Sequence, residues 1–243
     1  TTSTPNITID NNTGVEIISL EGSPILTNIT ATAEHTLALI MAVHSRIIPV
    51  QSDLSEWNRF NWGRKKMLSE MNFCIVGPGR IGKHLFNMAE HLFRDVNVVG
   101  PGDTERYIKG SVRDADILAI CASIRPEDRQ PIIDASVINQ LPKGAIIVNT
   151  ARSELLDYAH ALERYKEGHL SGLGFDVLPG EHNPQFPCFS EAHDHYVSRI
   201  ILDYATCNPY ENIVVTPHIA GSTETAWYKT QQAVVDILKD KLL

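Results

Sequence analysis

Cysteine is scarce in this sequence, and long hydrophobic runs are missing. Four cysteines among 243 residues are too few and too scattered for a disulfide framework, and Cys74 and Cys121 lie in apolar segments where a cysteine packs as a small hydrophobic residue. No apolar run approaches the roughly 20 residues needed to cross a bilayer. The polar residues 1–5 do not resemble a signal peptide. We therefore expect a cytoplasmic protein with no membrane partner.

Positive charge is also in the minority. Lys and Arg number 21 against 29 Asp and Glu, which gives a formal net charge of −8. This balance excludes a broad nucleic-acid surface, although it leaves room for a local basic pocket. We expect no nucleic-acid partner. The apolar share of 43% is ordinary for a chain that buries a core.

From residue 72 onward, short apolar runs alternate with helical patterns. Near-continuous apolar strands between helices are typical of a parallel sheet that is covered on both faces. The pattern predicts an α/β fold of the Rossmann type, with a doubly wound parallel sheet. The expected strands span 73–76, 96–99, 116–122, 145–149, 170–176 and 212–216, and the expected helices span 81–93, 154–166 and 223–238.

Two other segments have distinct patterns. Residues 32–48 predict a long helix that is apolar on both sides, which fits either packing inside one domain or a subunit interface. Residues 187–210 are polar and irregular, and we expect an inserted loop there. The potential metal ligands in this loop match no usual zinc spacing, so we expect no metal site; they are Cys188, His193, His195 and Cys207.

Residues 77–82 have the sequence Gly-Pro-Gly-Arg-Ile-Gly, directly after a predicted strand and at the start of a predicted helix. This context indicates a dinucleotide-binding turn. Gly77 permits the tight turn, Gly79 lets the backbone approach a pyrophosphate, and Gly82 lets the helix pack closely on the strand. The helix N-terminus then offers free N–H groups to the phosphates.

An acidic residue usually follows the second strand of such a fold and binds the ribose hydroxyls. Here Gly100 occupies that place, and Asp103 follows three residues later, from where it reaches the ribose only if the loop folds back. Arg106 or Lys109 could instead bind the 2′-phosphate of NADP. The choice between NAD and NADP stays open, with NAD favoured because no arginine directly follows the strand.

Four side chains follow later predicted strands at their carboxyl ends, where open α/β sheets bind ligands. Arg152 can hold a carboxylate with its planar guanidinium group. His218 can exchange a proton near neutral pH, and Glu181, if it contacts His218, would favour the imidazolium and fix the ring. Asp176 could hold the carboxamide of a nicotinamide. The helical histidines receive no catalytic role; they are His35, His44, His84 and His91.

Taken in order, these motifs resemble the D-isomer-specific 2-hydroxyacid dehydrogenases, the family of phosphoglycerate, glycerate and formate dehydrogenases. The resemblance covers most of the chain and is carried by 33–36, 77–82, 141–145, 149–152, 168–170, 175–177 and 216–221. It implies a catalytic trio of Arg152, Glu181 and His218. It also implies a homodimer formed through the long helix. The cofactor site implied by the resemblance is lined by Arg80, Ile81, Thr150, Ala151, Arg152, Asp176, His218, Ala220 and Gly221.

One departure from that family concerns its second, substrate-binding domain, of which only a truncated remnant is recognisable. We expect residues 1–30 to be this remnant, 31–221 to form the dinucleotide-binding domain, and 222–243 to be a helix returning toward the substrate domain. Most of the first half of that domain is not found in the sequence.

The function that these observations predict is transfer of a hydride between NAD(P) and C2 of a small 2-hydroxy or 2-keto acid. A dinucleotide-sensing scaffold is an alternative, because transcriptional co-repressors that resemble this family keep the same trio. A third possibility is a chain that binds cofactor but is inactive without the rest of the substrate domain.

Overall fold

The computed structural model describes residues 20, 23–52, 54, 57, 63–100, 103, 110–124, 131–188, 195–208 and 210–242. The chain divides into two compact units. The larger comprises residues 32–220, and the smaller comprises residues 1–31 and 221–243. All of the strands described below lie in the larger unit.

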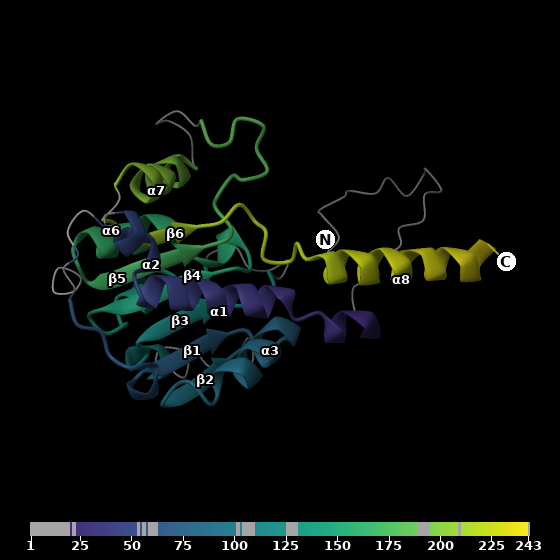
Figure 1. Cartoon of the computed structure of the whole chain (residues 1–243), viewed down its shortest axis with the longest axis horizontal. Coiled ribbons are helices and arrows are strands. Elements are labelled where there is room, and N and C mark those ends of the chain that lie inside the picture. Colours follow the sequence, from purple (N-terminus) through teal and green to yellow (C-terminus); the bar gives the residue numbers. More distant parts are fainter. Residues whose placement is uncertain are drawn as a thin grey trace. The chain divides into compact units, whose positions relative to one another are not determined.

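The larger unit is built on a six-stranded sheet with the strand order β2-β1-β3-β4-β5-β6 (Figure 1). Every neighbouring pair is parallel. The predicted doubly wound parallel sheet is therefore confirmed. The strands are β1 (Asn72–Val76), β2 (Asp95–Val99), β3 (Ile117–Ile120), β4 (Ala145–Asn149), β5 (Leu170–Phe175) and β6 (Ile213–Val215).

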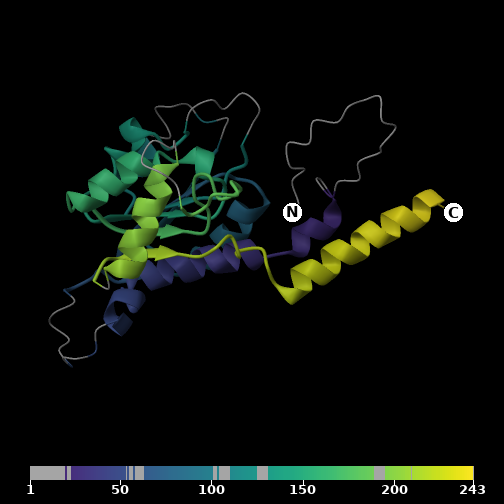
Figure 2. The same ribbon diagram turned by 90° about the horizontal axis from the view of Figure 1, so that it is seen from above.

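Helices cover both faces of this sheet (Figure 2). Alternate residues of a strand point to opposite faces, so Phe73 and Ile75 of β1 pack in one core while Cys74 and Val76 pack in another. The first core includes side chains of α1 (Ala31–His44) and α3 (Arg80–Ala89). The second includes side chains of α5 (Ala135–Ile138), α6 (Tyr158–Lys166) and α7 (Tyr196–Cys207).

The direction of winding reverses at β1. The chain passes from β1 through α3 to β2 on one side, and then returns to β3 on the other side of β1. Ligands of such sheets bind at the carboxyl ends of the strands where the order reverses. The fold thus points to the region just beyond Val76 and Ile120 as a binding crevice.

The helix predicted over 32–48 is interrupted. Helix α1 ends at His44, Arg46 adopts a left-handed conformation with φ of 52°, and a separate helix α2 (Ile47–Ser52) follows. Pro49 explains the break. In one continuous helix its ring would collide with the carbonyl four residues earlier, at Ser45, whereas in the first turn of a new helix it is tolerated. The first helix therefore has to end at residue 45 or 46.

The helix predicted over 154–166 begins later than expected. A 3-10 turn, η3 (Ser153–Leu155), comes first, and Asp157 then caps α6 by accepting a hydrogen bond from His160 N. Short 3-10 turns η1 (Pro24–Asn28) and η2 (Leu68–Glu70) complete the elements outside the sheet and its helices.

The prediction of an inserted loop over 187–210 is wrong for much of its length. Residues 196–207 form helix α7, with Ile201 fully buried and Val197, Ile200 and Tyr204 packed against the same core. These apolar residues recur three or four positions apart, which is the spacing of one helical face. Residues 189–194 and 209, including His193, lie outside the described part of the chain.

The smaller unit contains η1 and helix α8 (Glu224–Leu242), which replaces the helix expected over 223–238. Within this unit, Lys229 Nζ lies 3.5 Å from the carbonyl oxygen of Asn28. Trp227 and Tyr228 on α8 are largely exposed. None of the helices in the described residues is both long enough and apolar enough to span a membrane.

Candidate active site

The glycine turn lies between β1 and α3, at the carboxyl end of β1. Gly77 has φ of 115°, a conformation that favours glycine. A Cβ on Gly77 would lie 2.6 Å from Ala122 N, and a Cβ on Gly82 would lie 1.9 Å from the carbonyl oxygen of Gly77. Two of the three glycines are thus required by packing within the protein itself.

Gly79 differs from the other two. A Cβ at this position would meet no protein atom within 4 Å, and the backbone has an ordinary φ of −70°. Gly79 is also the N-cap residue of α3, and no side chain caps the helix there. Among the described residues, the space beside the N-terminus of α3 is therefore open at Gly79. This arrangement fits the pyrophosphate of a dinucleotide.

The next two residues of the motif start α3. Arg80 is half-buried, and burial lowers the pKa of its guanidinium. Ile81 packs against the core shared by α1 and α3. The first turn of this helix is thus held against the core by the side chain of Ile81.

An acidic side chain lies at the end of β2 although no acidic residue directly follows the strand. A Cβ on Gly100 would lie 2.6 Å from Pro78 Cγ, so the proline ring leaves no room for a side chain at this position. The loop folds back instead, because Gly100 N donates to Asp103 Oδ2 at 2.6 Å and Asp103 N donates to Gly100 O at 3.0 Å. The carboxylate of Asp103 is thereby held at the strand end.

The turn after β4 is held by buried polar groups. Asn149 accepts a hydrogen bond from Ala151 N at 3.0 Å and donates to Arg152 O at 2.9 Å. Thr150 Oγ1 lies 2.6 Å from Thr36 Oγ1 of α1. The hydroxyl of Tyr158 accepts from Asn149 and donates to the carbonyl oxygen of Val177. The turn that carries Arg152 is thus tied to the segment that follows β5.

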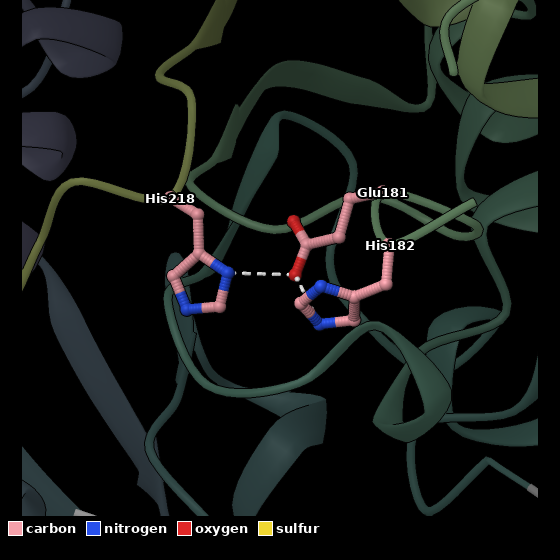
Figure 3. Close-up of side chains that lie close together, drawn as sticks. All are labelled: Glu181, His182 and His218. Atoms are coloured by element: carbon pink, nitrogen blue, oxygen red, sulfur yellow. Dashed lines mark hydrogen bonds and ion pairs between the residues drawn. The ribbon is translucent and has the colours of Figure 1, made fainter. Parts of the chain in front are cut away.

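Glu181 and His218 come from different loops, after β5 and β6, and are in contact. His218 Nδ1 lies 2.6 Å from Glu181 Oε1, and the other ring nitrogen is turned away from the carboxylate (Figure 3). The second oxygen of Glu181 accepts from Leu178 N at 3.3 Å. The side chain of His218 is 37% exposed and that of Glu181 is 17% exposed. The pair is therefore accessible from solvent, while the hydrogen bond from Leu178 N holds the carboxylate in place.

The electrostatic surroundings favour the protonated form of His218. The hydrogen bond with Glu181 raises the pKa of His218, partial burial opposes this effect, and the charges of Glu181 and Asp176 raise the pKa further. The positive charge of Arg152 acts in the opposite direction. The guanidinium of Arg152 is oriented by its own turn, since its Nη1 donates to Ala151 O at 2.7 Å.

Asp176 holds the backbone around His218. Its fully buried carboxylate accepts hydrogen bonds from Ile219 N, Ala220 N and the hydroxyl of Thr216, and its main-chain carbonyl accepts from His218 N. These bonds fix His218 at φ of 52°, which is uncommon for a residue other than glycine. In the described structure all of the oxygens of Asp176 thus serve the turn that carries His218.

His35 extends this network, a contact that no pattern in the sequence indicates. Its Nε2 lies 3.0 Å from Thr216 Oγ1 and 3.6 Å from Asp176 Oδ1. Because the hydroxyl hydrogen of Thr216 goes to Asp176, the ring N–H of His35 donates to Thr216. The only sequence signal was the motif at residues 33–36, which marks a resemblance but no role.

His182 is a second residue that the sequence reasoning missed. Its Nε2 lies 3.5 Å from Glu181 Oε1, so the carboxylate stands between two imidazoles (Figure 3). Within the described residues, Glu181, His182 and His218 are the one group whose donor atoms lie close enough together to hold a metal ion. Gly221, predicted to line the cofactor site, belongs to the smaller unit, where its carbonyl accepts from Thr223 N.

A doubly wound parallel sheet with a glycine turn after β1 and a carboxylate–histidine pair beyond β5 and β6 defines the class of Rossmann-fold dinucleotide-binding proteins. Residues 37–220 match the family model described as D-isomer specific 2-hydroxyacid dehydrogenase, NAD binding domain. The chain belongs to this family, and the matched region is its NAD-binding domain.

Individual relatives agree with this assignment. The glycerate dehydrogenase of Methylorubrum extorquens is 25% identical over 215 residues, which cover 84% of this chain and 62% of the relative. The D-3-phosphoglycerate dehydrogenase of Bacillus subtilis is 29% identical over 237 residues, which cover 91% of this chain and 40% of the relative. The chain thus spans about 40% to 60% of the length of these curated relatives.

Solved structures show the same fold. The D-lactate dehydrogenase of Aquifex aeolicus, determined with NAD and lactic acid, superposes with a TM-score of 0.73 at 20% identity, over 89% of this chain and 67% of that one. A D-2-hydroxyisocaproate dehydrogenase superposes with a TM-score of 0.72 at 24% identity, over 88% and 68% of the two chains.

Proposed function

We propose that this chain carries the cofactor-binding and proton-transfer parts of an NAD-dependent oxidoreductase that interconverts a small D-2-hydroxy acid and the corresponding 2-keto acid. The observation that carries the proposal is the 2.6 Å contact between Glu181 Oε1 and His218 Nδ1, formed between the loops after β5 and β6. A carboxylate that orients a histidine through one ring nitrogen leaves the other nitrogen to exchange a proton with a substrate.

The roles of the protein side chains follow from their contacts. In the oxidation direction, His218 Nε2 takes the hydroxyl proton of the substrate while Glu181 stabilises the imidazolium that forms. In the reduction direction, the same nitrogen returns the proton to the new alkoxide. Arg152 binds the substrate carboxylate and places C2 beside the histidine. Asp176 keeps the turn around His218 in its uncommon conformation, and a bound nicotinamide ring would supply the hydride acceptor or donor.

NAD is the cofactor that the described residues fit. The N–H groups at the start of α3 and the open space at Gly79 suit a pyrophosphate. Asp103, held at the end of β2, suits the two ribose hydroxyls and repels the 2′-phosphate of NADP.

The test combines binding and turnover. Titration with NADH and NADPH, followed by the fluorescence of the reduced nicotinamide, should give tighter binding of NADH. A panel of 2-keto acids should then be screened for loss of reduced-nicotinamide absorbance. His218→Ala should leave NADH binding largely intact and lower turnover by about 10²–10⁴-fold. Wild-type turnover in this variant would remove His218 from the mechanism, and no turnover with any keto acid would overturn the catalytic part of the proposal.

The co-repressor alternative gains nothing from the comparisons, since the relatives and structures described above are named as dehydrogenases. A protein that only senses the dinucleotide would bind NADH in the titration and reduce none of the keto acids.

A homodimer is the assembly that we propose for this chain. One side of α1 packs inward through Leu39, Ile40 and Val43, while Ile47 and Ile48 of α2 are half-exposed. A second copy would cover these apolar side chains. Sedimentation equilibrium should give twice the mass of the chain, and the mass should fall toward that of a monomer in Ile47→Glu. The cytoplasmic location remains a prediction from the sparse cysteines.

A further inference from the structure

Glu181, His182 and His218 bring three potential metal ligands to one point. Their donor atoms all lie within 4.8 Å of one another. Glu181 and His182 come from the segment after β5, and His218 comes from the segment after β6 (Figure 3). Two imidazoles and one carboxylate form a set that zinc uses in open, three-ligand sites.

We propose that Glu181, His182 and His218 form a site for Zn²⁺ or a similar divalent transition metal, and that metal bound there inhibits the enzyme. The binding part of this proposal stands on the geometry alone, whereas the inhibition part rests on the proposed function. Magnesium and calcium are not the fitting ions, because they prefer all-oxygen ligand sets.

Small side-chain movements would complete the site. Ligands at the zinc–nitrogen and zinc–oxygen distances found in proteins lie roughly 3.3 Å apart around a tetrahedral ion. Glu181 Oε1 is already 2.6 Å from His218 Nδ1 and 3.5 Å from His182 Nε2. The His182 side chain is 87% exposed, so it can rotate to close around an ion.

The surroundings of the group also suit a cation. Leu178 N donates to the second oxygen of Glu181, which keeps the carboxylate oriented in the way that ligating carboxylates usually are. The charge of Arg152 opposes a cation near His218, whereas the charge of Asp176 favours one. His182 is therefore the residue that distinguishes a metal site from a simple carboxylate–histidine pair.

Inhibition follows from which nitrogen the metal would take. Zinc on His218 Nδ1 displaces the proton that this nitrogen shares with Glu181. From the imidazolium, the displaced proton passes to solvent and the other ring proton stays on Nε2. From the neutral ring, the displaced proton passes to solvent while Nε2 takes one from solvent, so Nε2 carries the ring proton in both cases. A protonated Nε2 cannot accept the hydroxyl proton of a substrate, and it can release its own proton only by leaving an imidazolate. Both directions of the reaction are therefore blocked, while the glycine turn that binds the dinucleotide is untouched.

The experiment uses the whole chain after treatment with a chelator and removal of that chelator. Zn²⁺ affinity is measured by competition with a chromophoric chelator, and Co²⁺ serves as a visible-absorption probe of tetrahedral coordination. Wild type should bind one ion with an intense Co²⁺ spectrum. His182→Ala should weaken Zn²⁺ binding by at least about 10-fold, and should keep its NADH affinity and its turnover in metal-free buffer.

A matched control is available in His91→Ala. The His91 side chain is 88% exposed and lies 3.9 Å from a carboxylate oxygen of Glu90, so it forms a similar surface pair outside the proposed metal site. This variant should bind Zn²⁺ as wild type does. Wild-type affinity and inhibition in His182→Ala would overturn the proposal, because the ion would then lie elsewhere, for instance on the exposed Cys188 or Cys207.

The two proposals fail in different ways. If metal-free wild type reduces no keto acid, the proposed function fails, and the Co²⁺ spectrum alone decides whether the metal site exists. If the enzyme turns over and Zn²⁺ binds through His182 without lowering turnover, the inhibition part is overturned. Loss of turnover but not of NADH binding, relieved by His182→Ala, is the result expected.

Discussion

The ring of Pro78 lies against Gly100, so that the second residue of the glycine turn occupies the space in which a strand-end side chain would stand. An acidic residue at position 100 is sterically excluded. Asp103 takes over the position by a loop that returns to the strand through two hydrogen bonds with Gly100. Cofactor preference in this chain is therefore expected to depend on Asp103.

Asp103→Ala should weaken NADH binding by about 10- to 150-fold, because a hydrogen bond to a charged acceptor contributes roughly 1.5–3 kcal/mol. NADPH binding should change less, since the same substitution removes a repulsion. The measurement is a pair of fluorescence titrations. Asp95→Ala, at the opposite end of β2, is the matched control and should alter neither affinity. An unchanged ratio of the two affinities in Asp103→Ala would show that the carboxylate does not contact the ribose.

Gly79→Ala and Gly82→Ala should separate the binding and folding roles of the glycine turn. A methyl group on Gly79 meets only open space, whereas one on Gly82 would lie 1.9 Å from the oxygen of Gly77. We expect Gly79→Ala to keep the wild-type Tm and to lose NADH affinity. Gly82→Ala should lose about 1–3 kcal/mol of stability or more. Full NADH affinity in Gly79→Ala would mean that the pyrophosphate does not lie against this residue.

Glu181→Gln should move the pH dependence of the reaction to lower pH. The hydrogen bond with Glu181 is the main cause that raises the pKa of His218 above 6.5. Reduction requires the imidazolium, so kcat/KM for reduction falls as the pH rises through this pKa. Without the carboxylate the fall should begin at a lower pH. Profiles of kcat/KM in metal-free buffer test this, and coincident profiles for the two proteins would exclude Glu181 as the cause.

Asp176→Asn should loosen the turn that carries His218. The carboxylate accepts hydrogen bonds from Thr216 Oγ1, Ile219 N and Ala220 N. The NH₂ group of an asparagine would face at least one of these donors and could not accept its hydrogen. We expect a loss of about 1–3 kcal/mol of stability together with a lower kcat. His35→Ala, which removes only a donor to Thr216, should have a smaller effect in the same direction. Chemical denaturation and steady-state kinetics provide the two readouts, and a kcat as high as that of wild type in Asp176→Asn would refute the positioning role.

The central strands of this fold, β1, β3 and β4, could be predicted because they are short apolar runs that are almost entirely buried. Residues 145–149, for example, match β4 at both ends. Helix α7 was missed although its apolar residues have helical spacing, because polar residues around it dominated the interpretation. The break in the long helix could have been predicted from Pro49. A proline interrupts a helix when it falls in the interior but is tolerated in the first turn.

The site was harder to predict because its contacts join residues that are distant in the sequence. The roles given to Glu181 and His218 came from their positions after strands, and only the fold shows that the two side chains meet across 37 positions. The return of Asp103 to Gly100 depends on the position of Pro78 in another loop. The contacts of His35 and His182 could not be predicted, because the motif at residues 33–36 indicates no role for His35 and an isolated histidine on a helix or loop is compatible with many surroundings.

The dependence of the His218 turn on Asp176 has a consequence for protein engineering. Four hydrogen bonds connect the residue after β5 to the segment after β6, and the acid that orients the histidine also follows β5. A transplant of residues 216–221 alone would carry His218 without Asp176 and Glu181, the residues that hold its backbone and orient its ring. The smallest portable module is therefore the pair of adjacent strands with both of their trailing loops, and chimeras should be joined outside that pair.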